Sequence, residues 1–283
     1  MIERYPCAKL NLSLAVVGKR DDGFHEIRSW VVKVEWTDQL TLSPAKGLSL
    51  KVESEDRSIP AGPDNLVWKA AKRLAEAAGR APDVAIQLHK AVPAGAGLGG
   101  GSSDAAETLL GLNELWSLGW TPDRLAALGG QIGSDVPLFM MEGPVLMAGR
   151  GEVLSPLPMA WRGWALVIIP DFGLSTASVY ASWAETKGKP QDLDTAALQS
   201  ATTDSEILPL LFNDLESPAF SIEPRLQEIH KRIDGLDGRT VRMTGSGSAL
   251  FTLFDERSAA ESWKHRAAER MPPDTRFHIV RVL

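Results

Sequence analysis

The sequence predicts an α+β fold arranged in two domains, and three observations lead to this prediction. The chain has 283 residues, which is enough for two domains of ordinary size. Segments with strand periodicity and segments with helix periodicity mix in both halves, without internal repeats. Hairpins are expected as well as crossover connections, which favours α+β over a purely parallel sheet. Pro156 and Pro158 mark a boundary, so we expect one domain over residues 1–155 and a second over 156–283.

The first strand is indicated by residues 8–17, in which apolar and polar side chains alternate with a period of two. Leucines fall on one face, and Lys9, Asn11 and Ser13 fall on the other, so we expect a half-buried strand with one polar face. Turn residues such as Asp22-Gly23 separate the segments that follow. Further strands are predicted at 25–36, 38–43 and 47–53, so residues 1–55 should form a β-meander.

The rest of the first domain combines helices with one strand. Asp64 is a capping residue before a helix expected at 65–78, and Gly79 follows where a helix often ends. Thr121-Pro122 has the cap and the first-turn proline that open a short helix, ending near residue 128. A strand at 83–89, a glycine-rich loop at 93–101 and a helix at 102–116 are expected between them.

The second domain is predicted to mix strands and helices in the same way. A buried strand is predicted at 164–169, where apolar residues follow one another without interruption. Gly245-Ser246-Gly247 interrupts a pair of strands predicted within 239–254, and a closing strand is predicted at 276–282. Helices are predicted at 176–185, 224–234 and 256–270.

The glycine-rich loop that begins at Pro93 is the most informative stretch. Five glycines in the seven residues 95–101 remove side chains that would keep a ligand away from the backbone. Ser102 and Ser103 then open a helix, where free N–H groups and the helix dipole favour an anion, most naturally phosphate. A flexible connector is the plain alternative, but a connector has no need of a helix immediately after it.

Two widespread phosphate-binding motifs do not fit this loop. The Walker pattern requires a lysine after the glycines, and none follows them. Gly95-x-Gly97-x-x-Gly100 matches the dinucleotide fingerprint by letter, but that motif also needs an acidic residue about 20 positions later. Residues 115–120 contain no acid, so a dinucleotide site is not expected.

The full string P-x-G-x-G-L-G-G-G-S-S, at 93–103, resembles the central motif of the GHMP small-molecule kinases. Two further strings match the other motifs of that family, in its order and spacing: Ala8-Lys9-Leu10-Asn11-Leu12 and Thr244-Gly245-Ser246-Gly247-Ser248-Ala249. The resemblance implies an N-terminal ATP-binding domain like ribosomal protein S5 and a ferredoxin-like C-terminal GHMP kinase domain. It also implies transfer of a phosphoryl group from ATP to the hydroxyl group of a small molecule.

Shorter strings narrow the resemblance within this family. They are Asp22-Gly23-Phe24-His25, residues 97–106, Gly133-Ser134-Asp135-Val136-Pro137 and Phe212-Asn213-Asp214-Leu215-Glu216. Together they resemble the members that phosphorylate the 2-hydroxyl of a CDP-linked methylerythritol in the non-mevalonate isoprenoid pathway. Cys7 departs from the family pattern by replacing a proline, and Phe24 replaces a tyrosine, which keeps the ring and loses a hydroxyl. A kinase of the homoserine or mevalonate type is the alternative.

Lys9 and Asp135 are the expected catalytic pair. From the residues alone, Lys9 could equally be a surface lysine on an edge strand, and Asp135 a helix-capping residue. The resemblance implies that Asp135 is the general base and that Lys9 lies beside it. A carboxylate can accept the proton of an alcohol as the P–O bond forms, and a nearby ammonium keeps that carboxylate ionised.

ATP is expected at the glycine-rich loop, with its adenine near Asn65 and Trp68; a role for Asn65 in the first helical turn alone is the alternative. Magnesium should be carried by the ATP phosphates, with Ser102 or Ser103 as a protein ligand and helix capping as the equal alternative. The residues that the resemblance assigns to the phosphates are Pro93, Ala94, Gly95, Ala96, Gly97, Leu98, Gly99, Gly100, Gly101, Ser102 and Ser103.

The alcohol substrate and its cytidine are expected at Asn11, Phe24, His25, Thr176 and Tyr180. Thr176 and Tyr180 lie four positions apart, on one face of a predicted helix, so a hydroxyl and a ring can reach the same ligand. Phe24 and Tyr180 should sandwich the pyrimidine, and His25 should hydrogen-bond its edge. Core packing is the alternative for Tyr180. The segment 212–216 has no evident role beyond helix capping and domain contact.

The composition argues against several other classes of protein. The net charge is −6 and the basic residues are dispersed, which is unlike a nucleic-acid-binding surface. Cys7 is the only cysteine, so an internal disulfide is impossible and a cytoplasmic location is expected. The five histidines lack ligand spacing, so no zinc site is expected.

Membrane association and a purely non-catalytic role are also disfavoured. No apolar run reaches the length of a membrane span, and the start of the sequence does not have the pattern of a signal peptide. A nucleotide sensor built on the same fold is a third hypothesis. The presence of both Lys9 and Asp135 argues against it.

Overall fold

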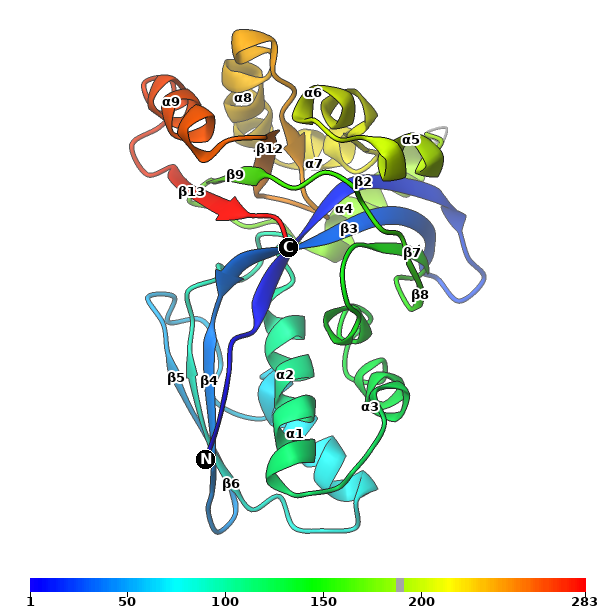
Figure 1. Ribbon diagram of the computed structural model, residues 1–283, viewed down its shortest axis with the longest axis vertical. Helices are drawn as coiled ribbons and strands as arrows, with labels where there is room; N and C mark the ends of the chain where they lie inside the picture. Colours follow the sequence, from blue (N-terminus) through cyan, green and yellow to red (C-terminus); the bar gives the residue numbers. More distant parts are fainter. Residues whose placement is uncertain (187–190) are drawn as a thin grey trace. The chain divides into compact units, whose positions relative to one another are not determined.

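The computed structural model describes residues 1–186 and 191–283, and Figure 1 labels its helices and strands. The chain forms two compact units, each assembled from three separate segments. Unit 1 comprises Met1–Ala8, Trp36–Ala94 and Gly99–Glu142, and unit 2 comprises Lys9–Glu35, Gly95–Leu98 and Gly143–Leu283. The predicted boundary between residues 155 and 156 falls within the last segment of unit 2, and the two-domain assignment at that position stays a prediction.

Unit 1 is built on a four-stranded sheet with two helices packed together beside it. The strand order is β1 (Ile2–Arg4), β4 (Gln39–Pro44), β6 (Val84–His89) and β5 (Leu48–Glu53). Strand β4 is antiparallel to both neighbours, whereas β5 runs parallel to β6. Helices α1 (Leu66–Ala77) and α2 (Gly100–Leu115) contact one another, α1 also contacts β5, and α2 also contacts β1 and β4. The parallel pair follows from the β5–α1–β6 crossover, which returns the chain to the same end of the sheet before β6 begins.

Local sequence explains where these helices begin and end. Asn65 caps α1 by accepting the N–H of Val67 at 2.9 Å, and Gly79 follows the helix with a φ of +63°. Thr121 caps α3 (Pro122–Gly129), and a short 3₁₀ helix, η1, covers Pro137–Met140. The buried face of α1 consists of residues spaced three and four apart, as an amphipathic helix requires: Val67, Ala70, Ala71 and Leu74.

Unit 2 contains two sheets. The first has the strand order β10 (Phe212–Asn213), β2 (Cys7–Lys19), β3 (His25–Thr37), β7 (Val145–Gly149) and β8 (Val153–Pro156). The first residues of β2 and the last residues of β3 belong to unit 1, so the chain passes between the units within these strands. The second sheet is antiparallel, in the order β11 (Arg242–Met243), β12 (Leu250–Phe254), β9 (Trp164–Ile169) and β13 (Arg276–Arg281).

Helices cover the second sheet and enclose an apolar core. Helix α9 (Arg257–Ala268) packs on β9, β12 and β13. The ring centroids of Trp263, in α9, and Phe254, in β12, lie 6.1 Å apart. Helices α7 (Glu216–Ile222) and α8 (Pro224–Ile233) contact each other, and α7 also contacts α4 (Thr176–Thr186). The remaining helical segments are α5 (Thr195–Ser200), α6 (Asp204–Ile207), η2 (Leu208–Leu210) and η3 (Leu236–Gly238).

Three expectations from the sequence are wrong. The β-meander is not formed, because β2 and β3 join one sheet whereas β4 and β5 join another. The helix cap is Asn65 rather than Asp64, because the side chain of Asn65 meets the first-turn N–H group. Strand β2 is buried on both faces: Lys9 and Asn11 are 4% exposed and Ser13 is 0% exposed. Other segments of unit 2 cover the polar face: the N–H groups of Lys9 and Asn11 donate to the Leu98 carbonyl and to Thr244 Oγ1, and Ser13 Oγ donates to the Leu210 carbonyl.

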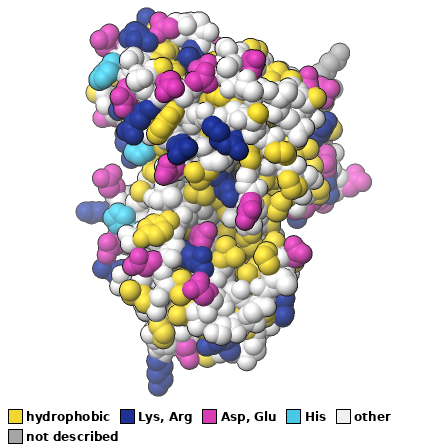
Figure 2. Space-filling view, viewed as in Figure 1, with side chains coloured by type: hydrophobic (Ala, Val, Ile, Leu, Met, Phe, Trp, Pro, Cys, Tyr) yellow, Lys and Arg dark blue, Asp and Glu magenta, His cyan; other side chains and the backbone are white. Residues whose placement is uncertain are grey.

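The predicted order of strands and helices is otherwise confirmed, with shifts of one to three residues at most ends. Among the residues that the structure describes, no helix combines the length and the apolarity that crossing a membrane requires. On the face drawn in Figure 2, lysine and arginine side chains lie among acidic and uncharged ones, as the dispersed charge in the sequence indicated.

Candidate functional site

The first glycine-rich loop, residues 93–99, has alternate glycines in the left-handed conformation. The φ angles of Gly95, Gly97 and Gly99 are +67°, +78° and +71°. A Cβ atom at Gly97 would lie 2.3 Å from the carbonyl oxygen of Thr244, so no side chain fits there. Gly99 is the N-cap of α2 and brings no capping side chain. The first-turn N–H groups of α2 are therefore left without a side-chain cap, which suits an anion.

The first turn of α2 also contains two buried polar atoms that lack a partner. Ser103 is 1% exposed and Asp104 is 2% exposed. Ser103 Oγ and Asp104 Oδ1 have no hydrogen-bond partner in the part of the chain that the structure describes. Buried hydroxyl groups are normally hydrogen-bonded, so the unpartnered Ser103 fits a site that is completed by a ligand.

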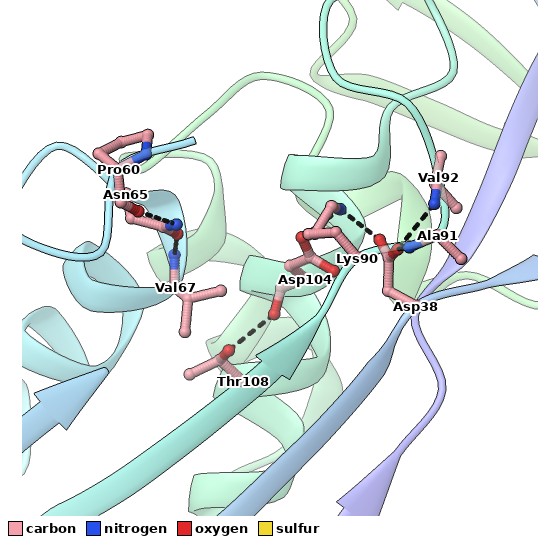
Figure 3. Close-up of polar contacts among 9 residues, drawn as sticks. All are labelled: Asp38, Pro60, Asn65, Val67, Lys90, Ala91, Val92, Asp104 and Thr108. Carbon is pink, nitrogen blue, oxygen red and sulfur yellow. Dashed lines mark hydrogen bonds and ion pairs between the residues drawn. The ribbon is translucent and has the colours of Figure 1, made fainter. Parts of the chain in front are cut away.

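A buried ion cluster of Asp38, Lys90 and Asp104 fixes both ends of this loop (Figure 3). The ammonium of Lys90, at the end of β6, donates to Asp38 and lies 2.7 Å from Asp104 Oδ2. The other oxygen of Asp38 accepts the N–H groups of Ala91 and Val92, at 2.6 and 2.8 Å, where the loop begins. Asp104 lies in α2, which follows the loop. Lys90 therefore links the residues that bind the start of the loop to the helix at its end.

The environment of the cluster shifts its protonation. Burial raises the pKa of Asp104 to about 8; the Lys90 ammonium opposes this shift and the Asp38 carboxylate adds to it. Burial acts to lower the pKa of Lys90, but the two carboxylates outweigh it and raise that pKa above its ordinary value. The cluster thus favours a charged lysine, and burial favours the protonated form of Asp104.

Sequence reasoning missed this cluster, because its members are far apart along the chain. Lys90 lies 52 positions from Asp38 and 14 from Asp104. The available signal was a single carboxylate beside the apolar Ala105 and Ala106, on a helix face that had to be buried.

The two residues predicted near adenine lie at the start of α1. Asn65 is 8% exposed, and its side-chain amide also donates to the Pro60 carbonyl at 2.7 Å, as Figure 3 shows. Trp68 lies in the first turn of the helix and is partly exposed. The contacts of Asn65 are those of a helix cap, and its role toward adenine stays a prediction.

Lys9 is held by a chain of hydrogen bonds inside unit 2. Its ammonium donates to Asn11 Oδ1, and Asn11 Nδ2 donates to Ser29 Oγ at 2.8 Å. Ser29 Oγ in turn donates to the Ser13 carbonyl at 2.8 Å. Because that carbonyl can only accept, Ser29 must accept from the amide nitrogen of Asn11, and the amide oxygen must face Lys9. The rotamer of Asn11 is thereby fixed.

The N-terminal and C-terminal motifs and residues 95–98 of the central one meet around Lys9. The N–H of Lys9 donates to the Leu98 carbonyl at 2.9 Å, and the N–H of Asn11 donates to Thr244 Oγ1 at 2.9 Å. We call residues 244–249 the second glycine-rich loop. A Cβ at Gly245 would lie 3.2 Å from Lys9 Nζ, 3.3 Å from Asn11 Oδ1 and 3.3 Å from the Gly97 carbonyl oxygen. The absence of a side chain at Gly245 therefore lets the backbone of the second glycine-rich loop lie close to Lys9 and Asn11.

The predicted substrate residues of unit 2 form two groups. His25 stacks on Tyr180, with 5.2 Å between ring centroids and 28° between planes, and meets Trp183 edge-on at 5.5 Å. His25 Nε2 is buried and has no hydrogen-bond partner among the described residues. Thr176 Oγ1 lies 2.8 Å from Ser246 Oγ, which connects the start of α4 to the second glycine-rich loop.

Phe24 lies directly before His25, at the start of β3, and its place beside a pyrimidine stays a prediction. The side chain of Phe24 is 51% exposed, and the Arg150 guanidinium lies 4.7 Å from its ring centroid. Burial lowers the pKa of His25, and the charge of Lys19 lowers it further, so the imidazole is neutral at pH 7. A neutral imidazole with a free nitrogen can donate to, or accept from, the edge of a pyrimidine.

Asp135 lies in unit 1, in the turn that precedes η1, and is partly buried. Its role as a base and its pairing with Lys9 stay predictions. No group of three His, Cys, Asp or Glu residues that could hold a metal ion occurs within 1–186 and 191–283.

Comparison with known proteins identifies the family. The model "GHMP kinases N terminal domain" matches residues 65–143, and "GHMP kinases C terminal" matches 196–273. A protein of Geobacter sp. (strain M21), named 4-diphosphocytidyl-2-C-methyl-D-erythritol kinase, is 37% identical over 255 residues, 90% of each chain. A protein of Pelotomaculum thermopropionicum with the same name is 40% identical over 259 residues, 89% of each chain.

Solved structures agree with this assignment. The crystal structure of a 4-(cytidine 5'-diphospho)-2C-methyl-D-erythritol kinase superposes with a TM-score of 0.82 at 35% identity, covering 99% of each chain. Homoserine kinase from Cytophaga hutchinsonii superposes with a TM-score of 0.71 at 19% identity, covering 98% of this chain and 95% of its own. At that identity the second likeness shows a shared fold and carries no statement about substrate.

Proposed function

The chain belongs to the GHMP kinases and is an ATP-dependent small-molecule kinase, and on that premise we propose that its alcohol substrate is 4-diphosphocytidyl-2-C-methyl-D-erythritol. The γ-phosphoryl group of ATP passes to the 2-hydroxyl of this substrate, and ADP is released. The relatives that share over a third of its sequence carry the name of this activity. A homoserine or mevalonate kinase would need no site for a pyrimidine.

The observation that favours a cytidine is the arrangement of His25, Tyr180 and Trp183. His25 stacks on Tyr180 and meets Trp183 edge-on, and His25 Nε2, which has no partner among the described residues, provides a hydrogen-bonding group at the edge of these rings. A pyrimidine offers the complementary surfaces, which are two flat faces and one polar edge. Phe24, exposed beside Arg150, is assigned to the same base.

The proposed chemistry uses Asp135 as the general base. Its carboxylate takes the proton of the 2-hydroxyl while that oxygen bonds to the γ-phosphorus and the bond to the ADP oxygen breaks. Such proton transfer contributes ~10²–10⁴-fold to the rate. Alignment of the hydroxyl with the phosphorus contributes more, up to ~7–11 kcal/mol of the barrier.

Lys9 supplies positive charge where negative charge develops. The Asn11–Ser29 hydrogen-bond chain holds its ammonium at a fixed place, and Gly245 lets the second glycine-rich loop lie close to it. A preorganised cation in a buried site stabilises a transferring phosphoryl group more than the same cation in water. Asn11 and Thr176 are assigned to the alcohol and the diphosphate.

The first glycine-rich loop and the start of α2 are assigned to the ATP phosphates. The uncapped N–H groups of the first helical turn fit this role, and Asn65 and Trp68 are assigned to the adenine. Magnesium would be bound by the phosphates together with a serine, and the unpartnered hydroxyl makes Ser103 a better ligand than Ser102. The bound cation would neutralise phosphate charge. The proposal places the reaction in the cytoplasm, with small molecules as partners.

A panel of alcohols tests the proposed function. ADP formation is measured with the cytidyl substrate, homoserine, mevalonate and phosphomevalonate, each at several concentrations. We expect turnover with the cytidyl substrate at a kcat/KM at least about 100-fold above the others, which corresponds to ~2.8 kcal/mol of discrimination. CMP should bind the enzyme and compete with the alcohol. A preference for mevalonate or homoserine, or absence of CMP binding, would contradict the proposal.

A further inference from the structure

The segment Phe212–Glu216 is placed by the structure directly behind the second glycine-rich loop. Strand β10 (Phe212–Asn213) pairs in parallel with Ser13 and Leu14 of β2, the strand that carries Lys9. The N–H of Asp214 donates to the Leu14 carbonyl at 2.9 Å, and Asp214 Oδ2 accepts the N–H of Val16 at 2.9 Å. One end of the segment is thus bound to the strand of the catalytic lysine.

The side chain of Asn213 is bound to the second glycine-rich loop. It is 4% exposed, and its amide nitrogen donates to the carbonyls of Met243 and Gly245 at 2.7 and 2.8 Å. Its amide oxygen accepts the N–H of Leu215 at 2.9 Å. Both amide hydrogens and the oxygen are therefore used, and the two carbonyls on either side of Thr244 are held at one nitrogen.

Glu216 binds the same stretch through the backbone N–H of Met243. Glu216 Oε1 accepts the N–H of Met243 at 2.7 Å. The N–H of Met243 is therefore bound by Glu216, and its carbonyl by Asn213. The residue before the loop is fixed on both sides, so the position of Thr244 depends on two side chains of one short segment.

The loop that these side chains hold is the one that surrounds Lys9. Thr244 Oγ1 accepts the N–H of Asn11, and a Cβ atom at Gly245 would lie 3.2 Å from the ammonium nitrogen of Lys9. We propose that Asn213 is a positioning residue for phosphoryl transfer: it sets the distance between the second glycine-rich loop and Lys9 without touching substrate. The inference rests on the proposed kinase function and adds a residue to its machinery.

The test compares Asn213→Asp with Asn113→Asp. Aspartate keeps the volume of asparagine and the acceptor for Leu215, but it loses both donors and repels the two carbonyls. Asn113 makes the same kind of local contacts, with the N–H and the carbonyl of Trp120, in a segment without assigned substrate residues. We expect Asn213→Asp to lower kcat by ~10–100-fold, the size that a displacement near 1 Å produces. KM for the alcohol should change by less than about 3-fold, because His25 and Tyr180 are untouched.

Hydrogen exchange of residues 243–249 in the free enzyme gives a readout that does not depend on the substrate. We expect exchange in this peptide to be at least about 10-fold faster in Asn213→Asp and unchanged in Asn113→Asp. If Asn213→Asp does not fold, Asn213→Ser and Asn113→Ser repeat the comparison without an added charge.

The outcomes separate this inference from the proposed function. Wild-type kcat in a folded Asn213 variant, or unchanged exchange at 243–249, overturns the inference. An equal loss of kcat in the Asn113 variant also overturns it, since the effect is then one of general stability. If the wild-type enzyme phosphorylates a different alcohol, the proposed substrate fails, and the comparison of variants is made with that alcohol.

Discussion

The imidazole of His25 lies stacked on the phenol ring of Tyr180, with ring centroids 5.2 Å apart and the planes 28° from parallel. The two residues come from different elements, β3 and α4, so the stack is made by the tertiary fold. Among the described residues, His25 Nε2 has no hydrogen-bond partner, and it lies at the edge of the rings of His25, Tyr180 and Trp183. A planar ligand with a polar edge is the natural complement, and this is the basis of the first prediction.

Replacing Tyr180 with alanine should weaken binding of the alcohol substrate. Loss of one stacking ring costs ~1–3 kcal/mol, so KM for the alcohol should rise by ~5–150-fold, with KM for ATP nearly unchanged. Tyr5→Ala is the matched control, because Tyr5 is the only other tyrosine and is 57% exposed. Steady-state kinetics at varied alcohol and ATP concentrations measure both constants. Unchanged KM for the alcohol in Tyr180→Ala would make this ring a core residue.

Asp135→Asn should remove the proton acceptor and leave the nucleotide site intact. We expect kcat to fall by ~10²–10⁴-fold, and Lys9→Ala to cause a loss of similar size, while ATP affinity by calorimetry changes little. Asp123→Asn, at an exposed aspartate in the first turn of α3, is the control for the same chemical change. A kcat near the wild-type value in Asp135→Asn would exclude this residue as the base.

Gly95→Ala should reduce ATP affinity without unfolding the protein. No atom lies within 4 Å of a Cβ built at Gly95, and its φ of +67° imposes a strain of ~1–2 kcal/mol on alanine. Gly79→Ala is a matched control, because Gly79 has a φ of +63° and equally open space, at the end of α1. Both variants should lose similar stability in thermal unfolding, but only Gly95→Ala should bind ATP more weakly by calorimetry. Equal ATP affinity in both variants would show that Gly95 does not face the phosphates.

Asp104→Asn should change how stability depends on pH. The folded-state pKa of Asp104 is about 8, above its ordinary value of 3.8, so between these values the folded protein keeps a proton that the unfolded chain has lost. Raising the pH through that window therefore lowers the free energy of unfolding, by at most ~1.4 kcal/mol per pH unit. The asparagine variant lacks this titration. Urea unfolding from pH 5 to 8 should show wild type losing stability relative to the variant as the pH rises; parallel curves would contradict the assignment.

Ser103→Ala should raise the requirement for magnesium. The buried Ser103 hydroxyl has no partner among the described residues, and a serine oxygen is a suitable ligand for a cation carried by ATP. We expect the magnesium concentration for half-maximal rate to increase several-fold in Ser103→Ala and less in Ser102→Ala. Chelation of the cation should abolish turnover of the wild type. A larger increase in the magnesium requirement of Ser102→Ala would make Ser102, and not Ser103, the magnesium ligand.

The sequence predicted most elements, because their periodicity and caps are local properties. Thr121-Pro122, for example, opens α3 as its residue types require. Sheet membership was not predictable, since β4 and β5 follow β3 closely in sequence but pair with β6. Strand β10 has two residues, too few for any period to appear. Asp64 and Asn65 are both capping types, and only the backbone geometry selects Asn65.

The candidate site was predictable where residues are adjacent in sequence and not where they meet only in space. Lys9 and Asn11 share a strand face, so their proximity followed from alternation. The burial of that face depends on Leu98, Leu210 and Thr244, which come from distant segments. The stack of His25 on Tyr180 joins β3 to α4, which are far apart in sequence, and no local pattern pairs them. The sandwich of a pyrimidine between Phe24 and Tyr180 stays a prediction.

Because the segments of the two units alternate along the sequence, they set the order in which a nascent chain can fold. Each unit is assembled from three segments, and the surroundings of Lys9 include Thr244. A ribosome that has released only residues 1–155 has delivered the strand of the lysine without β10, β11 or the second glycine-rich loop. The lysine pocket is therefore completed near the end of synthesis, and loop closure over more than 230 positions must precede it. Chaperone dependence and premature proteolysis should consequently concentrate on chains released before residue 249.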